Sequence, residues 1–336
     1  MTKNLSIGVL GTGFSSVHVE RLGKLDDVAV TAVCGRSLEK AQAFNHRMGL
    51  IDAKAFGDFD EMLDGSHLDV HYICLPPHAH HDQEAKAAQR GIHLFLEKPI
   101  AYDLNQAEEI VAAIEKAGIV SQVGYQMRFF KAVHALKEMP DPGRPTLFEG
   151  RFWANFEGPS WWADKAGSNG QVYEQVTHIY DIARYLFGEP ESASGLMANL
   201  CHQNDPAYTV EDTSVATIRF RNGALGMISG SNCAIPERFL GGFRAAFENV
   251  TLDFNASADP QQTNTSTLFI HDGKTITQQL DFEEDGDPYL DQTIAFLKAV
   301  RGEGPQVCPA REGLLDIRLT TAVMESAESG GRPAQI

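Results

Sequence analysis

The chain has 336 residues, of which 43% are hydrophobic and 22% are charged. This composition excludes a mainly disordered chain, and the length favours two domains over one. Lys and Arg together number 28 against 45 Asp and Glu, so the formal charge is −17, which disfavours binding to nucleic acid or to an anionic membrane.

The cysteines and the apolar runs indicate the compartment. There are five cysteines, widely spaced and without a CxxC pair: Cys34, Cys74, Cys201, Cys233 and Cys308. This pattern favours reduced thiols that serve as packing residues. The amino terminus lacks a long apolar segment, and no run approaches the length of a membrane span. We therefore expect a soluble, cytoplasmic protein.

The first third of the chain alternates short apolar runs with amphipathic segments, the pattern of βαβ units around a parallel sheet. The expected strands are 5–10, 28–34, 70–75, 93–96 and 119–123, and the expected helices are 38–48, 81–90 and 105–117. Pro76 and Pro77 end the third of these strands, because proline cannot continue a central ladder. The fold class expected here is a doubly wound α/β domain that ends near Gly124.

Beyond Gly124 the pattern changes to longer alternating strands joined by hairpin turns. Asn222-Gly223 and Asp272-Gly273 each separate two alternating runs, as in antiparallel hairpins. Helical stretches are expected at 171–187, 289–301 and 311–329. The sequence therefore predicts a cofactor domain at 1–124 and an α+β domain at 125–336.

A glycine-rich segment directly follows the first expected strand. Gly11 would permit the tight turn, and Gly13 would let the backbone approach a pyrophosphate at the amino terminus of the next helix. The third position of this fingerprint is Ser16, a small residue in place of glycine. A lone glycine-rich turn is often only a turn, but its place in a βαβ unit favours dinucleotide binding.

The end of the second expected strand indicates which dinucleotide is bound. An acidic residue normally stands there to contact the adenosine ribose of NAD, whereas this chain has Gly35, Arg36 and Ser37. A guanidinium and a hydroxyl suit the additional 2′-phosphate of NADP. We therefore expect NADP in preference to NAD, the alternative being that Arg36 is a solvated loop residue.

Four segments together carry a family resemblance. They are GTGFSSVH, LPPHAHHDQEAKAAQRGIH, the Glu-Lys-Pro of LFLEKPIA, and VGYQMRF. In this order they resemble the glucose–fructose oxidoreductase and inositol dehydrogenase family, the Gfo/Idh/MocA group, and the resemblance extends to the carboxyl-terminal helices. It implies a Rossmann domain, then an α+β domain with a large open-faced, mostly antiparallel sheet. It also implies hydride transfer between a nicotinamide cofactor and a hydroxyl or carbonyl carbon of a sugar, sugar derivative or cyclitol.

The resemblance assigns catalytic roles residue by residue. Lys98 would be the catalytic lysine, and His178 matches the family histidine. Glu174 stands where an aspartate is usual, and Asp181 matches an acid that follows. On a continuous helix Glu174, His178 and Asp181 would form one polar stripe, the alternative being a solvent-facing side of that helix. Histidine can accept a proton near neutral pH, so Lys98 and His178 are expected as an acid–base pair oriented by Glu174, with the final proton acceptor left open.

Further contacts are expected to the cofactor and the substrate. The predicted cofactor contacts include Phe14, Pro77, His80, Glu97 and Arg128. For Arg128 a structural salt bridge is an equal alternative. The predicted substrate contacts are Asp181 and the paired Trp161 and Trp162, which would stack on a sugar ring unless they belong to the core.

Two other functions are weighed against this one. His78, His80 and Asp82 follow a strand as in a zinc hydrolase, but Gln83 replaces the last histidine of that motif and no downstream ligand set is evident. We therefore expect no metal. The other alternative is a catalytically silent NAD(P)-binding regulator. Expected partners are a small sugar or polyol and further copies of the chain, as a homodimer or homotetramer through the open sheet face, which the resemblance implies.

Overall fold

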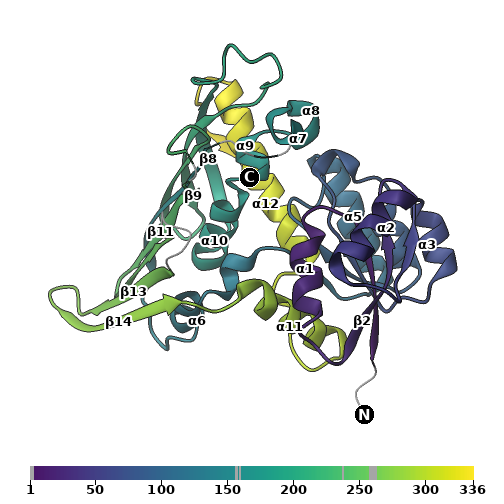
Figure 1. The fold of residues 1–336 in the computed structure, drawn as a ribbon. Coiled ribbons are helices and arrows are strands. Elements are labelled where there is room, and N and C mark those ends of the chain that lie inside the picture. Colours follow the sequence, from purple (N-terminus) through teal and green to yellow (C-terminus); the bar gives the residue numbers. More distant parts are fainter. Residues whose placement is uncertain (1–3, 156–157, 159, 237, 257–262) are drawn as a thin grey trace. The chain divides into compact units, whose positions relative to one another are not determined.

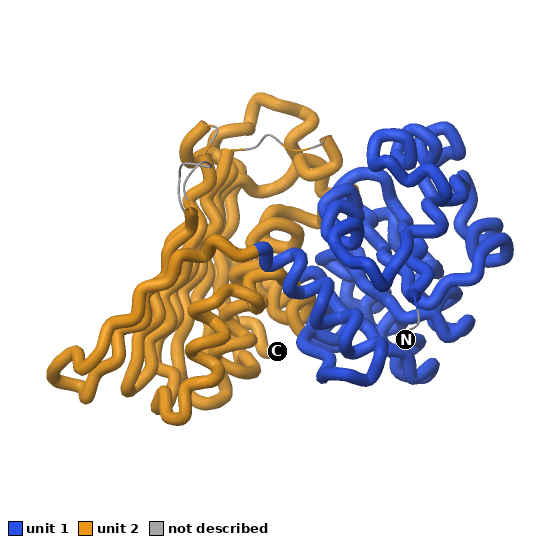
Figure 2. The backbone as a smooth tube through the Cα atoms, turned by 60° about the horizontal axis from the view of Figure 1, so that its bottom comes forward, with its two compact units in different colours: residues 1–124, 287–314 blue, residues 125–286, 315–336 orange. Residues whose placement is uncertain are grey.

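The computed structural model describes residues 4–155, 158, 160–236, 238–256 and 263–336 (Figure 1). The chain divides into two compact units, the first made of residues 1–124 and 287–314 and the second of residues 125–286 and 315–336 (Figure 2). The sequence-based division at Gly124 did not anticipate that 287–314 returns to the first unit. Among the described residues, no helix is long and apolar enough to cross a membrane.

The first unit is built on a parallel sheet with strand order β3-β2-β1-β4-β5-β6. Its strands are β1 Leu5–Leu10, β2 Val28–Cys34, β3 Lys54–Phe56, β4 Val70–Ile73, β5 His93–Leu96 and β6 Ser121–Val123. Its helices are α1 Ser15–Leu22, α2 Leu38–Met48, α3 Phe59–Gly65, the 3₁₀ turn η1 Pro77–Ala79, α4 Gln83–Gln89, α5 Leu104–Ala117 and α11 Pro288–Val300. The predicted doubly wound domain is confirmed, and β3 and α3 are additional to the prediction.

Local signals set the ends of these helices. Ser37 caps α2 by accepting a hydrogen bond from the Lys40 amide, and Asp103 caps α5 in the same way. Both helices end at a glycine with positive φ, as expected for left-handed carboxyl caps. Helix α11 adds Phe296 and Leu297 to the core that β1, β4 and α1 form. The late segment therefore completes the first unit's interior.

The second unit is built on a sheet with strand order β14-β13-β12-β11-β7-β10-β9-β8-β15. Its strands are β7 Pro145–Trp153, β8 Pro190–Ala198, β9 Thr213–Phe220, β10 Leu225–Ser231, β11 Leu240–Phe247, β12 Val250–Asn255, β13 Asn264–His271, β14 Ile276–Glu284 and β15 Ala334–Gln335. All neighbours are antiparallel except β7 and β10. The two predicted hairpins, β9–β10 and β13–β14, are confirmed.

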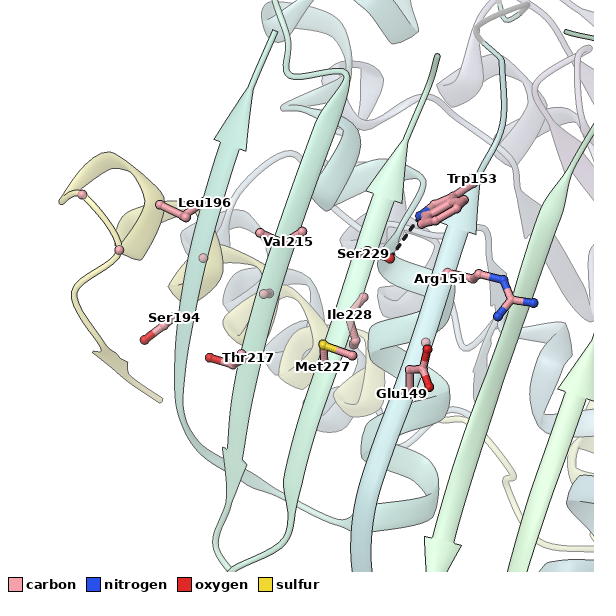
Figure 3. Close-up of a pocket in the computed structure, with 15 residues that line it drawn as sticks. Glu149, Arg151, Trp153, Ser194, Leu196, Val215, Thr217, Met227, Ile228 and Ser229 are labelled. Atoms are coloured by element: carbon pink, nitrogen blue, oxygen red, sulfur yellow. Dashed lines mark hydrogen bonds between the residues drawn. The ribbon is translucent and has the colours of Figure 1, made fainter. Parts of the chain in front are cut away.

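Helices cover one face of this sheet and leave the other open. The second unit's helical segments are η2 Gln126–Phe129, α6 Lys131–Lys137, α7 Ser160–Ala163, α8 Lys165–Ser168, α9 Gln171–Glu174, α10 Thr177–Phe187 and the later part of α12 Ala310–Glu328. Helix α10 packs on β7, β10 and β11, and α6 packs on β12, β13 and β14. Strand β9 alternates between buried and exposed side chains accordingly. The open face is shown in Figure 3.

Candidate functional site

The glycine turn joins β1 to α1 in the first unit. Gly11 has φ of 101°, and a Cβ atom there would lie 2.3 Å from the Cys74 carbonyl oxygen, so only glycine fits. A Cβ atom added at Gly13 would meet no protein atom within 4 Å. Ser16 donates from its hydroxyl to the Gly13 carbonyl, and Phe14 is exposed. The turn thus leaves open space directly before the amino terminus of α1, as a pyrophosphate site requires.

The end of β2 is followed by one basic residue and no carboxylate among residues 35–37. Arg36 is exposed, while the Ser37 hydroxyl serves as the cap of α2. A Cβ atom at Gly35 would lie 2.9 Å from the Ala41 amide nitrogen, so this close approach to α2 needs glycine. A second guanidinium escaped the sequence analysis. Arg47, in the last turn of α2, donates to the Thr12 carbonyl beside the glycine turn at 3.2 Å.

The segment after β4 places His80 in the interior. Pro77 is buried in the first turn of η1. The His80 ring is 1% exposed, and its Nδ1 lies 2.6 Å from Glu84 Oε1. Its Nε2 is buried and has no hydrogen-bond partner among the described residues. A buried ring nitrogen of this kind is suited to contact a bound polar ligand.

The same geometry weakens the metal hypothesis for this segment. The Nδ1 atom of His80 is hydrogen-bonded to Glu84. In the described part of the chain, the one cluster of at least three Cys, His, Asp or Glu ligand atoms lies elsewhere, in the second unit. The zinc hydrolase alternative therefore has no ligand set at His78, His80 and Asp82.

The end of β5 carries Glu97 and Lys98. Glu97 is buried, and its Oε1 lies 2.6 Å from Nε2 of the buried His18 in α1. Its Oε2 accepts the Lys98 backbone amide at 3.1 Å. A Cβ atom at Gly124 would lie 2.6 Å from Glu97, so glycine is needed beside this carboxylate. Glu97 thus holds the backbone of the half-buried residue Lys98. Its own partner, His18, was not predicted from the sequence.

The helix expected at 171–187 is interrupted. Helix α9 ends at Glu174 and α10 begins at Thr177, and the Val176 amide reaches back to the Gln171 carbonyl in a wider turn. The single polar stripe predicted for Glu174, His178 and Asp181 is therefore wrong, because the three residues do not share one continuous helix.

His178 lies in the first turn of α10 and is half-buried. Its ring is perpendicular to that of Tyr125 at 6.1 Å between centroids and parallel to that of Phe152 at 6.4 Å. Glu174 is 3% exposed. Aromatic rings therefore lie on two sides of the histidine ring.

Arg128 and Asp181 form a buried ion pair within the second unit. The Arg128 Nε and Nη2 both donate to Asp181, at 2.5 to 3.1 Å, and the two residues are 1% and 0% exposed. The guanidinium also lies over the Tyr185 ring, 4.6 Å from its centroid. The structure therefore corrects two predictions: Arg128 takes its salt-bridge alternative, and Asp181 holds Arg128 where a substrate contact was expected.

A second buried carboxylate supports the start of α10. Asp316 accepts hydrogen bonds from the hydroxyls of Tyr125 and Thr177. Burial, reinforced by the negative charge of Asp181 and opposed by Arg184, raises the pKa of Asp316 to about 7. Asp316 thus carries a proton over much of the acidic range. Nothing local in the sequence marks this residue as part of the site.

Trp161 and Trp162 both lie in α7 and are half-buried, with their rings perpendicular at 5.7 Å. The Ser168 hydroxyl donates to the Trp162 carbonyl and so joins α8 to α7. The Trp162 ring also lies against Gly158, where a Cβ atom would come within 1.7 Å of it. The pair is thus partly packed and partly accessible, so its exposure is intermediate between that of a core residue and that of an open substrate contact.

The residues of the first unit fit a nicotinamide dinucleotide. The open space at Gly13, the amino terminus of α1 and the orphaned His80 Nε2 would hold its diphosphate and other polar groups. Lys98 follows the end of β5, at the edge of an open parallel sheet where ligands bind.

Comparison with known proteins agrees with this fit. Two family models match: the oxidoreductase family NAD-binding Rossmann fold at residues 5–125 and the oxidoreductase family C-terminal alpha/beta domain at residues 143–336. Among curated relatives, the myo-inositol 2-dehydrogenase of Thermotoga maritima is 25% identical, covering 96% of both chains. The D-glucoside 3-dehydrogenase of Escherichia coli is 26% identical, covering 98% of this chain and 97% of its own length.

Solved structures share the fold over the whole length. A levoglucosan dehydrogenase in complex with NADH and levoglucosan has a TM-score of 0.87 at 20% identity, covering 99% of both chains. A dehydrogenase, WlbA of Bordetella pertussis, in complex with NADH and UDP-GlcNAcA, has a TM-score of 0.80 at 22% identity and the same coverage. With the glycine turn, the Lys98 segment and both matching domains, this chain belongs to the Gfo/Idh/MocA oxidoreductase family.

Proposed function

We propose that this protein is a dehydrogenase that oxidises a secondary hydroxyl of a sugar, sugar derivative or cyclitol, or reduces the corresponding carbonyl. The observation that carries the proposal is the presence of Lys98 after β5 in a chain that matches both family domains. The named relatives act on inositol and on glucosides, and the wide coverage of both chains supports a substrate of that class.

Lys98 and His178 are proposed as the acid–base pair. A nicotinamide cofactor supplies the hydride acceptor when it is bound. The hydroxyl proton must leave as the hydride does, and either the lysine amine or the histidine imidazole can take it. The Glu97 carboxylate fixes the Lys98 backbone, and the rings of Tyr125 and Phe152 orient His178. Glu174 is retained as a positioning residue beside α10, and Trp161 and Trp162 as substrate contacts.

NADP is proposed as the preferred dinucleotide. The basic Arg36 is exposed at the end of β2, and Arg47 lies against the glycine turn. Guanidinium groups bind phosphate in two-pronged geometry, and residues 35–37 carry no acid to repel it. The names of the relatives include both an NADP-dependent xylose dehydrogenase and an NAD-dependent inositol dehydrogenase, so the family accommodates either cofactor.

The open sheet face is proposed to bind a second copy of the chain. Exposed apolar side chains gather on it: Leu147, Trp153, Leu196, Val215, Leu225 and Met227. Trp153, Leu196, Val215 and Met227 line a shallow hollow of about 710 Å³. Glu149 and Arg151 also line it and stand side by side on β7 (Figure 3). Opposite charges on one strand can pair with their counterparts across a two-fold axis. Met227→Glu should convert the assembly to monomers in light scattering, and an unchanged mass would exclude this face.

The proposed activity is tested by following cofactor reduction with a panel of polyols, aldoses and cyclitols. Lys98→Ala should lower kcat by about 100-fold or more, since general acid–base groups contribute ~10²–10⁴-fold, while cofactor affinity stays nearly unchanged. Lys116→Ala, an exposed lysine on α5, is the matched control. Tight cofactor binding without turnover on any substrate would favour a regulator, and activity that depends on stoichiometric zinc would favour a hydrolase.

A further inference from the structure

Two cysteines meet at one end of the second unit's sheet. Strands β8, β9 and β10 are neighbours, and Thr213 of β9 is in register with Ala198 of β8 and Ser231 of β10. Cys201 and Cys233 follow just beyond the ends of β8 and β10. Their sulfur atoms and a carboxylate oxygen of Asp212 all lie within 4.8 Å of one another. The two thiols thus meet beside the start of β9, the strand that lies between β8 and β10.

These two thiols differ in exposure from the others in the chain. Cys34, Cys74 and Cys308 are buried, whereas Cys201 is exposed and Cys233 is half-buried. The prediction that the cysteines are packing residues therefore fits the buried three and fails for this pair. Reactivity of a thiol requires access as well as thiolate character.

Backbone contacts hold both cysteines in place. The Cys201 amide donates to Asp212 Oδ2 at 2.7 Å. Cys233 forms an isolated antiparallel bridge with Asn155, and its amide donates to the Ser231 hydroxyl at 3.2 Å. The hydroxyl oxygens of Ser231 and Thr213 lie 3.6 and 3.8 Å from Cys233 Sγ, within hydrogen-bonding reach of the sulfur. The pair is therefore preorganised rather than formed by two mobile loops.

Both oxygens of the Asp212 carboxylate beside the pair already accept hydrogen bonds from the protein. Asp212 Oδ1 accepts hydrogen bonds from the Leu200 amide and the Thr213 hydroxyl. Its Oδ2 accepts from the amides of Cys201 and His202 and from the His202 ring at Nδ1. Burial alone would raise the pKa of Asp212, but these donors hold it below its usual value.

This arrangement favours sulfur–sulfur chemistry over metal binding. A structural zinc site takes four protein ligands, and a catalytic one takes three. With the Asp212 lone pairs engaged, the cluster offers two sulfurs. The neighbouring Cys233 thiol, with a further contribution from the nearby Asp212 charge, raises the pKa of Cys201.

We propose that Cys201 and Cys233 form a dithiol site. A small disulfide such as oxidised glutathione oxidises this pair to an internal disulfide. One cysteine thiolate attacks the small disulfide, forms a mixed disulfide and releases one small thiol. The other cysteine thiolate then attacks the protein sulfur of that mixed disulfide and releases the second small thiol. The two cysteine protons pass to the two released thiolates, so the protein loses two electrons and the small disulfide gains them.

The Cys201–Cys233 disulfide would link the segment after β8 to the segment after β10, next to the start of β9. Glu211, next to Asp212, accepts the Val172 amide at 2.8 Å through its carboxylate, which links this end of the sheet to α9. Oxidation would therefore restrict the segment that precedes α10. This consequence is separate from the proposed dehydrogenase activity, because the disulfide can be detected without any substrate.

The test treats the full-length reduced protein with oxidised glutathione at mildly alkaline pH, where more of the Cys201 thiol is ionised. The protein is then denatured and alkylated, and its intact mass is measured. The chain has five cysteines. We expect two fewer alkyl groups than in the untreated protein, a single linked peptide joining Cys201 to Cys233 in a non-reducing digest, and full recovery after dithiothreitol.

Three variants make the result specific. Cys201→Ser and Cys233→Ser should each lose the linked peptide, and the cysteine that remains should carry at most one glutathione. Cys34→Ala, at a buried cysteine, should keep the linked peptide, and peptide mapping of the wild type decides the matter if this variant does not fold. The proposal is overturned if all five cysteines remain alkylated after oxidation or if the linked peptide joins another pair. Stoichiometric zinc in the purified protein, lost in both serine variants, would also overturn it, in favour of a metal site.

Discussion

The two units bury ionisable groups in different ways. In the first unit, two buried histidines pair with buried glutamates, His18 with Glu97 and His80 with Glu84. In the second unit, Arg128 pairs with Asp181 while Asp316 is held by neutral hydroxyls. An imidazole can hydrogen-bond a glutamate or its amide replacement, whereas a guanidinium stays charged and needs an anionic partner when it is buried. Disruption should therefore cost the second unit more free energy than the first.

The largest effect is expected at the arginine. Arg128→Met leaves the Asp181 carboxylate buried without its partner, and such a loss typically costs about 3–5 kcal/mol. The three tryptophans, Trp153, Trp161 and Trp162, all lie in the second unit, so urea unfolding followed by tryptophan fluorescence reports on that unit. The double variant Arg128→Met with Asp181→Leu should recover much of the loss. A midpoint that Arg128→Met leaves unchanged would contradict the role of the pair.

The matched change in the first unit is Glu97→Gln. The amide keeps the shape and can still accept the Lys98 amide, but it loses the charge that pairs with His18. We expect a smaller loss of about 2 kcal/mol, in the range for one charge-assisted hydrogen bond. Circular dichroism, which detects both units, measures it. If Glu97→Gln lowered the free energy of unfolding as much as Arg128→Met does, the two units would not differ in the cost of losing a buried pair.

The third prediction concerns pH. The pKa of Asp316 is raised to about 7, so the folded protein keeps a proton that the unfolded chain releases near pH 4. The stabilisation from this group is present below pH 4 and is lost as the pH rises toward 7. Asp316→Asn removes the titration, and the stability of the variant relative to wild type should rise by about 4 kcal/mol between pH 4 and pH 8, since each of the roughly three pH units between the two pKa values contributes ~1.4 kcal/mol. A pH-independent difference would show that Asp316 does not titrate there.

The smallest effect is expected at the surface of the cofactor unit. Arg36→Ala should weaken NADP binding by about tenfold, or about 1.4 kcal/mol, and leave NAD binding nearly unchanged. Isothermal titration with both dinucleotides measures the ratio, and Lys40→Ala, an exposed cation on α2, is the control. Equal losses for both cofactors would mean that Arg36 contacts a group common to both. Gly35→Asp is unsuitable, because a side chain there meets the α2 backbone.

The sequence predicted the first unit better than the second for a physical reason. Gly11 and Lys98 follow strands whose apolar runs are visible locally, so their places at the sheet edge could be inferred. The partners His18 and Arg47 are set by how α1 and α2 pack, which no local pattern states. In the second unit, the approach of Asp316 to Thr177 brings distant segments together, and no proline or glycine marks the wider turn between α9 and α10. Periodicity alone therefore predicted one continuous helix.

The place of α11 in the first unit has a consequence for synthesis. The six parallel strands are complete in the nascent chain at Val123, yet Phe296 and Leu297 belong to the same core and emerge only after every strand from β7 to β14. Until then the apolar side chains that α11 covers, Leu22 and Phe95 among them, stay uncovered during translation. A chain that ends before residue 287 would therefore leave these side chains exposed, whereas a chain that extends well past residue 314 can cover them.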